Sequence, residues 1–538
     1  MGCRPGTFLE LNHRRRRSCR LGIVLLLIGA LLPAGVLYGQ AETQQDVAGQ
    51  EAEMPAVEDT PPAVGERVLE LTLEDAIQLA LQNSLAIERE RFGPLIALTD
   101  TDRAKVEFDP KVGAEVNVSE TQNLRTNQNP IFMPILDSRS TLSAYLRHTI
   151  VTGGNYELRF VTARSDQSPD DAGFGRRIHN PLYENSLELT FTHPLLQNFG
   201  ISVNKAPIRQ SELREQIAEQ NVIQAILDTV FAVHQGYWEL VFRIQDLAAK
   251  RESQKLAEDF LAENTVRVEL GTLAPIELVQ AETRVKTREG DVIVAEAVLR
   301  DADDQLKAVL NIPESMGSWS VRLQPTDSPS FTPVSTVAVE EQVDVAMRQR
   351  PDYLSSQLDI QVRESLRDEA RNQSLPRLDV IGTGRLNAHD ADLGDALSNI
   401  PDADGYQWAV GLQMEVTLGS RAKRVLIDKR QLELRQARVN QRQLTAAIVQ
   451  QIRQAVRSIR TTIQRVEVTR SATMLARTQL EAEQEKFRLG LSTSFNVLEF
   501  QEDLTNALSN ETRALSDYNV ALAQLDQLTG MMQYQDAP

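Results

Sequence analysis

Cysteine is almost absent from this sequence. The chain of 538 residues has two cysteines, Cys3 and Cys19, and both lie within the first 39 residues. A chain processed after residue 39 would have none, which excludes a disulfide scaffold, a thiol enzyme and a cysteine-based metal site. Aromatic residues make up only 5% of the chain, too few for an aromatic-rich globular core. With 25% charged residues, the chain is also too charged for a helical membrane protein with several spans.

The charge balance is acidic. Lys and Arg number 57 against 75 Asp and Glu, which gives a formal net charge of −18. Residues 1–39 hold six arginines and one glutamate, so 51 basic and 74 acidic residues remain beyond them, giving −23. Such a chain repels polyanions, and we expect no nucleic-acid partner.

Motifs for catalysis or metal binding are missing as well. The six histidines include no i, i+4 pair, and the sequence has neither a Gly-x-Ser-x-Gly motif nor a glycine-rich phosphate loop. Asp301, Asp303 and Asp304 lack the glycine and the terminal glutamate of a calcium loop. We therefore expect no cofactor, no metal and no enzyme activity.

The N-terminal region indicates export. Four consecutive arginines, Arg14–Arg17, precede an apolar run from Leu21 to about Leu37, which is typical of a secretory signal peptide. A single N-terminal membrane anchor is the alternative, because the run approaches the length of a spanning helix. Cys19 lies before the apolar run, so a lipid attached to cysteine is excluded.

The same pattern occurs twice along the chain. Residues 73–81 resemble residues 339–347 at an offset of 266, and Pro110 matches Pro376 at the same offset. Each proline follows a helical pattern and precedes alternating apolar residues. A helix that ends near the proline and continues as a strand fits both places.

A second pair of matching segments has a shorter offset. Leu270-Gly271 recurs as Leu489-Gly490 at an offset of 219, and each is followed by an apolar segment with one polar residue. The difference from 266 is 47, so the first half carries about 47 extra residues. We place them within residues 123–184, where Asn, Asp, Gly and Ser are frequent. The sequence thus predicts an internal duplication with one enlarged region.

These patterns divide the chain into six segments. They are a signal peptide at 1–39, a disordered acidic tail at 40–67, a first structural repeat at 68–310, an inter-repeat linker at 311–335, a second structural repeat at 336–530 and a C-terminal tail at 531–538.

Several segments alternate between apolar and polar residues with the period of a strand. The clearest run from Val410 to Leu418, from Leu187 to Thr192 and from Tyr156 to Phe160. Such strands suit a half-buried sheet or a barrel wall between lipid and water. The turn Val151–Asn155 predicts a hairpin. Residues 140–165 could therefore form two extra membrane strands or an enlarged surface hairpin.

The predicted helices are exceptionally long. Residues 421–489 contain neither glycine nor proline, and residues 207–270 are interrupted only by Gly236. A helix of 69 residues would be about 100 Å long. Shorter helices are predicted at 275–310 and 495–529. Helices this long and polar cannot bury themselves in a compact domain and must pack on other helices as a coiled coil or a helical barrel.

Each half therefore predicts a helix, strands, a very long helix, a glycine turn and a helix. One chain offers too few strands to close a membrane barrel, so closure requires several chains. The result is a ring oligomer with a β end and a helical end.

With these features the chain resembles the TolC-like outer membrane efflux proteins over about residues 68–530. The resemblance lies in the two Leu-Gly turns, the paired helix–proline–strand openings and the segment Thr192–Gly200. It implies a mixed α/β membrane protein: a trimeric tube whose outer-membrane β-barrel is shared between protomers and continues into a long periplasmic α-helical barrel. Such a homotrimer sits in outer membrane lipid. It serves as the exit duct for drugs, metals or secreted proteins, and it docks on an inner-membrane transporter through a periplasmic adaptor protein.

The resemblance also implies a gate at the periplasmic tip, where acidic rings narrow the pore. The matching positions, six and nine residues after Gly490, are Asn496 and Glu499, and an acid of a closing link matches Glu277. Where the family has a basic partner, this chain has Ser492 and so departs from the charge-paired lock. Alternatively, both glutamates are solvated acids on a helix face.

Two further pairs of residues have predicted roles. Gly271 and Gly490 are expected to end helices in a left-handed cap, and in the family this turn contacts the adaptor. Tyr406 and Trp408, at the start of an alternating strand, could anchor the membrane interface or pack within a loop. Two other functions stay open at this point: a periplasmic adaptor and an exported coiled-coil structural protein.

Overall fold

The computed structural model describes residues 68–122, 136–168, 180–272, 274–316, 318–333, 337–390, 392–398, 405–419 and 421–532. The predicted signal peptide, the acidic tail and residues 533–538 lie outside these ranges. All described residues belong to one compact unit.

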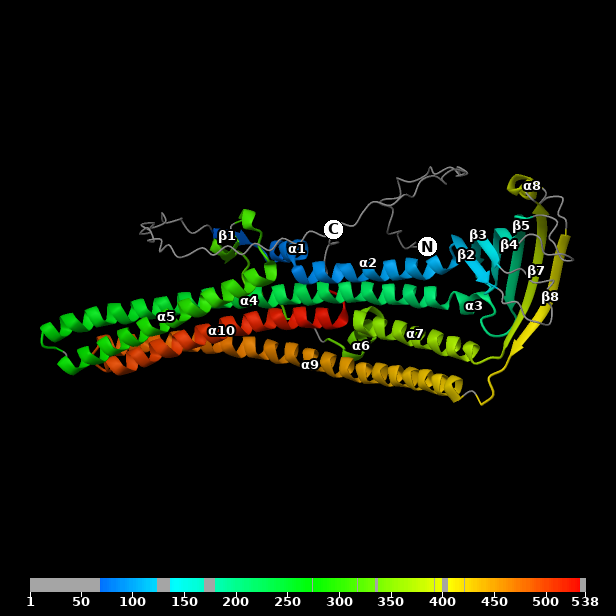
Figure 1. The fold of residues 1–538 in the computed structure, drawn as a ribbon. Helices are drawn as coiled ribbons and strands as arrows, with labels where there is room; N and C mark the ends of the chain where they lie inside the picture. Colours follow the sequence, from blue (N-terminus) through cyan, green and yellow to red (C-terminus); the bar gives the residue numbers. More distant parts are fainter. Residues whose placement is uncertain are drawn as a thin grey trace, which may run out of the picture. The chain divides into compact units, whose positions relative to one another are not determined.

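Four long helices run through this unit (Figure 1). Helix α4 spans Ala206–Glu269 with 64 residues, and α9 spans Arg421–Arg488 with 68 residues, about 100 Å at the usual helical rise. Helices α5, Pro275–Leu310, and α10, Ser494–Thr529, have 36 residues each. The predicted long helices are confirmed, with bounds within one residue of those read from the sequence.

The shorter helices recur at the offset of the sequence repeat. Helices α1, Leu73–Asn83, and α6, Val339–Gln349, both have 11 residues, and their first positions differ by the offset of 266. Helices α2, Leu85–Lys105, and α7, Pro351–Gln373, begin at the same offset. The remaining short elements are α3 Ile201–Asn204, α8 Leu393–Ser398, and the 3-10 turns η1 Val106–Phe108, η2 Glu314–Met316 and η3 Ser318–Ser320.

The helices lie side by side in a layer. Next to the sheet the order is α2, α4, α7, α9, and further from the sheet it is α5, α4, α10, α9 (Figure 1). Apolar residues between neighbours form the core, including Leu240 of α4 with Leu306 of α5, and Ile452 of α9 with Tyr518 of α10. Each helix thus buries an apolar stripe against its neighbours.

A parallel pair of short strands, β1 Val68–Leu71 and β6 Arg322–Pro325, packs near the middle of α4. Tyr237 of α4 is fully buried there, and its hydroxyl donates to Asp327 at 2.9 Å or to the carbonyl oxygen of Leu71 at 3.1 Å. Burial raises the pKa of Tyr237 to about 12, so this hydroxyl remains a donor at neutral pH. No helix in the described ranges combines the length and the hydropathy needed to cross a bilayer.

The other end of the layer carries a single antiparallel sheet of six strands in the order β2-β3-β4-β5-β7-β8. Residues 140–165, left open by the sequence, lie in two strands of this sheet and in the turn between them. The strands are β2 Lys111–Gln122, β3 Leu136–Thr149, β4 Asn155–Ser168, β5 Leu182–Pro194, β7 Arg377–Asp390 and β8 Gly405–Glu415.

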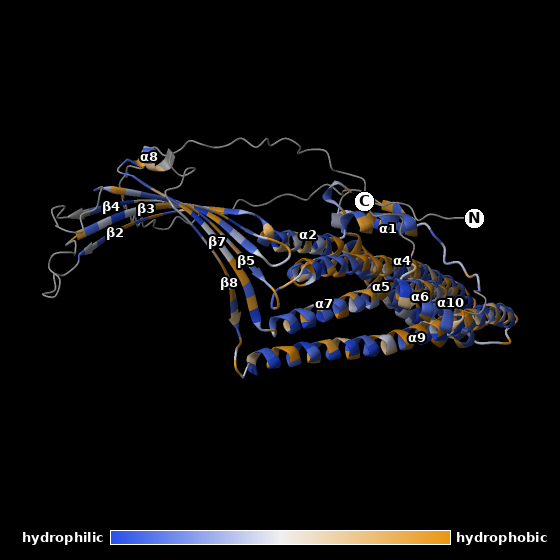
Figure 2. Ribbon diagram, turned by 90° about the vertical axis from the view of Figure 1, so that its right-hand side faces the viewer, coloured by the Kyte–Doolittle hydropathy of each residue, from blue (hydrophilic) through white to orange (hydrophobic). Residues whose placement is uncertain are grey.

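The register of the sheet separates an apolar face from a polar one. Leu146 lies opposite Leu158, which in turn lies opposite Leu189, so apolar residues form rows across neighbouring strands. Arg159 and Glu188, one position further along, share the other face. Figure 2 shows the corresponding alternation of hydrophilic and hydrophobic residues along the strands.

The predicted β3–β4 hairpin has a tight glycine turn. Gly153 has a φ of +98°, a conformation that favours glycine. Its N–H donates to the carbonyl oxygen of Ile150 at 2.8 Å, and the N–H of Gly200 donates to the carbonyl oxygen of Thr152 at 3.1 Å. A Cβ atom at Gly153 would lie 2.1 Å from the carbonyl oxygen of Asn198. The turn therefore packs against the segment that leads into α3.

We expect Gly153→Ala to destabilise the protein by about 1–3 kcal/mol, because the added Cβ meets backbone and the left-handed conformation is strained. Gly382→Ala is the matched control, since a Cβ atom at this strand glycine meets nothing within 4 Å. Denaturant unfolding followed by circular dichroism measures both. Equal stability of the two variants would contradict the packing described for the turn.

Candidate functional site

The two helical hairpins end in turns of the same geometry. Gly271 has a φ of +71° and Gly490 a φ of +74°, which confirms the predicted left-handed caps. The N–H of Thr272 donates to the carbonyl oxygen of Arg267, and the N–H of Leu491 to that of Lys486, both at 2.9 Å. These bonds satisfy the last carbonyl groups of α4 and α9 in the manner of a Schellman cap. The glycines are thus required by the backbone itself.

The two turns share a small core. Phe260 and Phe487 pack with their ring centroids 5.1 Å apart, and the guanidinium of Arg267 lies 4.7 Å from the Phe487 ring centroid. Fully buried Asn264 of α4 donates to the hydroxyl of Ser494 of α10 at 3.2 Å. The tips of the two hairpins therefore form one packed unit.

A polar network fixes the second turn. Glu483, only 7% exposed, accepts a hydrogen bond from the hydroxyl of Ser492 and pairs with Lys486 at 2.9 Å. The side-chain amide of Asn496, a predicted pore residue, donates to the Ser492 hydroxyl at 3.3 Å. The hydrogen bond from Ser492, followed by that from Lys486, holds the pKa of Glu483 below its usual value. Ser492 thus closes the turn by hydrogen bonding.

The other two predicted pore residues lie in different surroundings. Glu499 is exposed on α10, directly after the buried Leu498. Glu277, in the first turn of α5, is half-buried, and its Oε2 atom is buried without a hydrogen-bond partner in the described part of the chain. The hydrogen bonds found among the described tip residues do not join Glu277, Asn496 and Glu499 to one another.

Two charged groups at the tip were missed in the sequence. The carboxylate of Glu502 on α10 forms ion pairs with Arg284 at 2.7 Å and with Arg288 at 3.0 Å. Both arginines belong to α5, and Arg288 is only 8% exposed. The four-residue spacing of the two arginines was the available signal, because it places both on one helix face. For Glu483 the spacing indicated only Lys486, three residues later on the same helix, since its other partner, Ser492, lies beyond the turn.

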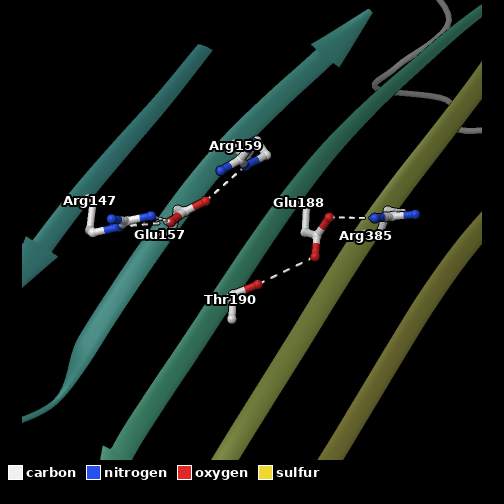
Figure 3. Close-up of polar contacts among 6 residues, drawn as sticks. All are labelled: Arg147, Glu157, Arg159, Glu188, Thr190 and Arg385. Atoms are coloured by element: carbon white, nitrogen blue, oxygen red, sulfur yellow. Dashed lines mark hydrogen bonds and ion pairs between the residues drawn. The ribbon is translucent and has the colours of Figure 1, made fainter. Parts of the chain in front are cut away.

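The polar face of the sheet carries a ladder of paired charges (Figure 3). Glu157 pairs with Arg147 at 2.6 Å and with Arg159 at 2.8 Å, and Glu188 pairs with Arg385 at 2.5 Å.

The predicted interface residues lie on the opposite, apolar face of the sheet. Tyr406 and Trp408 of β8 are 78% and 73% exposed, and they continue in Val410, Leu412 and Met414. These residues present a wide apolar surface.

Glu483→Gln should loosen the second turn at neutral pH. The folded-state pKa of Glu483 is lowered, so the carboxylate stabilises the turn above the pKa of an unfolded glutamate. This stabilisation is lost as the pH falls through the folded-state pKa. We expect several-fold faster amide hydrogen exchange around residues 486–496 at pH 7, with the difference from the unmodified protein shrinking in acid. Glu481→Gln, at an exposed position on the same helix, is the control; an equal effect there would contradict this role.

Known proteins with similar sequences are outer membrane proteins. The family model described as "Outer membrane efflux protein" matches residues 343–531. The chain is 23% identical over 436 residues to outer membrane protein TolC of Vibrio cholerae, covering 78% of this chain and 92% of that protein.

Solved structures share the fold at low sequence identity. The CmeC outer membrane channel of Campylobacter jejuni matches with a TM-score of 0.61 and 16% identity, over 86% of this chain and 87% of that one. The outer membrane protein VceC of Vibrio cholerae matches with a TM-score of 0.62 and 15% identity, over 85% of this chain and 96% of that one. Together with the family model and the curated relative, these similarities confirm the resemblance seen in the sequence. Residues 343–531 thus match the outer membrane efflux protein family, and the described chain has the fold of the TolC-like outer membrane channels.

Proposed function

We propose that three copies of this chain form one tube, which serves as the exit duct of a tripartite efflux or type I secretion system. Transport through the tube is passive. The energy comes from an inner-membrane transporter, which a periplasmic adaptor connects to the helical tip. The observation that carries this proposal is that the sheet ends in unpaired strand edges and that the helices next to those edges expose apolar stripes.

Both edges of the sheet are open. Strands β2 and β8 each pair on one side only among the described strands. Neighbours in the sheet are antiparallel, so with six strands β8 of one copy runs antiparallel to β2 of the next. Closure between copies would satisfy backbone groups that a lone protomer leaves unpaired.

The helix layer has open edges in the same places. Phe92, Leu95 and Ile96 form an exposed apolar stripe on α2, the helix that leads into β2. Val425, Leu432 and Val439 form an exposed stripe with heptad spacing on α9, the helix that follows β8. A second copy of the chain is the natural partner for these stripes, because it would cover both the helix stripe and the strand edge beside it.

The chain halves also fit the proposed duplication. Matching helices recur at offsets of 266 and 219, which supports structural repeats at 68–310 and 336–530, joined by a linker at 311–335. Two repeats in each of three copies would give the tube six similar units around its axis.

At the tip we propose that Glu499 forms an acidic ring in the pore, with Asn496 supporting it through the second turn. The exposed carboxylate of Glu499 supports this role, since three copies on one ring would attract cations. Glu277 is the candidate for a link between copies, because its buried Oε2 atom lacks a partner within the described chain.

Partner contacts follow from exposed apolar groups. The turns at Gly271 and Gly490 present Leu270, Leu489 and Leu491, each at least 66% exposed, and form the proposed adaptor contact. At the other end, Tyr406 and Trp408 would lie at the interface of the outer membrane lipid, where aromatic rings are favoured.

Leu432→Glu should weaken assembly, because it places a charge in the proposed helix contact between copies. We expect a several-fold higher protein concentration to be needed for half-assembly, measured by sedimentation velocity in detergent. Leu270→Glu changes another exposed leucine, at the tip, and should leave assembly unchanged. An unaffected Leu432→Glu oligomer would remove α9 from the contact.

Glu499→Gln should lower the preference for cations over anions in single-channel recordings, because it removes three carboxylates from the proposed ring. Glu467→Gln is the control, since this exposed acid of α9 lies well before Gly490, about 35 Å along the helix. Unchanged selectivity in Glu499→Gln would exclude Glu499 from the constriction.

A further inference from the structure

We propose that the β3–β4 hairpin is an additional pair of wall strands, so that the assembled channel has an eighteen-stranded barrel in the outer membrane. Six strands from each of three copies give eighteen, whereas four from each would give twelve. The proposal deepens the function proposed above and rests on its trimer.

The hairpin has no counterpart in the second half of the chain. Between α7 and α9 the described chain forms two strands of the sheet, β7 and β8, whereas between α2 and α4 it forms four. Strands β2 and β7 begin at Lys111 and Arg377, which is the same offset of 266 as between α1 and α6. Strands β5 and β8 are each the last strand before a long helix. The correspondence therefore leaves β3 and β4 as the addition.

The hairpin cannot leave the sheet without breaking it. Strand β3 pairs with β2 along the whole of Lys111–Gln122, and β4 pairs with β5 along Asn155–Ser165. Within the described sheet, β2 is joined to the other strands only through β3. If β2 lines the membrane at the edge between copies, the hairpin must lie in the wall beside it.

The side chains of the hairpin suit a wall between lipid and water. Leu146 and Leu158 continue the apolar row between Val112 of β2 and Leu189 of β5. The opposite face carries Arg147, Glu157 and Arg159, which belong to the charge ladder of Figure 3. The guanidinium groups of the two arginines also lie 5.4 and 5.2 Å from the ring centroid of Tyr145. A hairpin surrounded by water would need no continuous apolar row.

The hairpin is also long enough and positioned to span the bilayer. Each of its strands has 14 residues, and a transmembrane strand needs about 9–11. Its turn is held at the helical end of the sheet by the hydrogen bond between Gly200 and Thr152. The hairpin thus begins at the same level as the connections to the long helices.

A wider exit follows from the added strands. Barrel diameter grows roughly linearly with strand number, and barrels of about 16–18 strands leave an aqueous channel. An eighteen-stranded section would be about 1.5 times as wide as a twelve-stranded one. In this design the membrane section does not limit the size of the hydrophilic cargo, and size selection falls to the helical tip.

Cysteine labelling tests the position of the hairpin, since the chain beyond residue 19 has no cysteine. The protein without the predicted signal peptide, which holds Cys3 and Cys19, is reconstituted in vesicles and treated with a charged, membrane-impermeant maleimide. Leu158→Cys should be protected to the same degree as Leu189→Cys, its register partner on β5. Thr141→Cys, on the polar face, should react at least ten-fold faster than either.

Three results are informative. Protection of both leucine positions supports the proposal. Fast labelling of Leu158→Cys with Leu189→Cys protected would place the hairpin outside the bilayer and overturn the proposal, while the membrane channel would stand. Fast labelling of Leu189→Cys would show that the sheet itself is outside the membrane, which overturns the proposed function too.

Electron cryo-microscopy of the detergent-solubilised oligomer gives the strand number directly. Eighteen strands around three copies are expected. A ring of twelve strands, with β3 and β4 outside it, would overturn the inference and leave the trimer intact.

Discussion

The pairing of backbone groups at the sheet edges is the constraint on which the rest of this structure depends. In a bilayer no water is available for an unpaired N–H or carbonyl group, so a sheet can cross it only when it closes on itself. A protomer whose described sheet ends in unpaired edges on β2 and β8 does not meet this requirement alone. The same protomer exposes apolar stripes on α2 and α9, the helices next to those strands. Strand closure and helix packing therefore call for the same neighbour.

Much of this architecture could be predicted from local sequence signals. Long helices follow from the absence of glycine and proline between Arg421 and Arg488, and the β3–β4 turn follows from Gly153-Gly154. Strand alternation showed which residues share a face, and the family likeness was visible in the paired Leu-Gly turns. The comparisons with known proteins confirm that likeness, and a channel family does not accommodate the adaptor or the coiled-coil filament considered from sequence alone.

Contacts between distant segments could not be predicted in the same way. The strand order depends on β5 pairing with β7 across α4 and α5, and local periodicity carries no information about such partners. At the tip, the partners of Glu502 lie on α5, a helix of the other half of the chain. The link between Glu483 and Ser492 depends on the cap geometry at Gly490, which positions the hydroxyl only once the turn has formed. The pore roles of Asn496, Glu499 and Glu277 depend on symmetry-related copies and remain predictions.

The central claim is that neighbouring copies complete the fold, and native mass spectrometry of the protein extracted in mild detergent tests it most directly. The account predicts a single dominant species with three times the mass of the processed chain, stable on dilution. A folded monomer with its helical content intact would contradict it, because the strand edges and helix stripes would then be satisfied without a second copy.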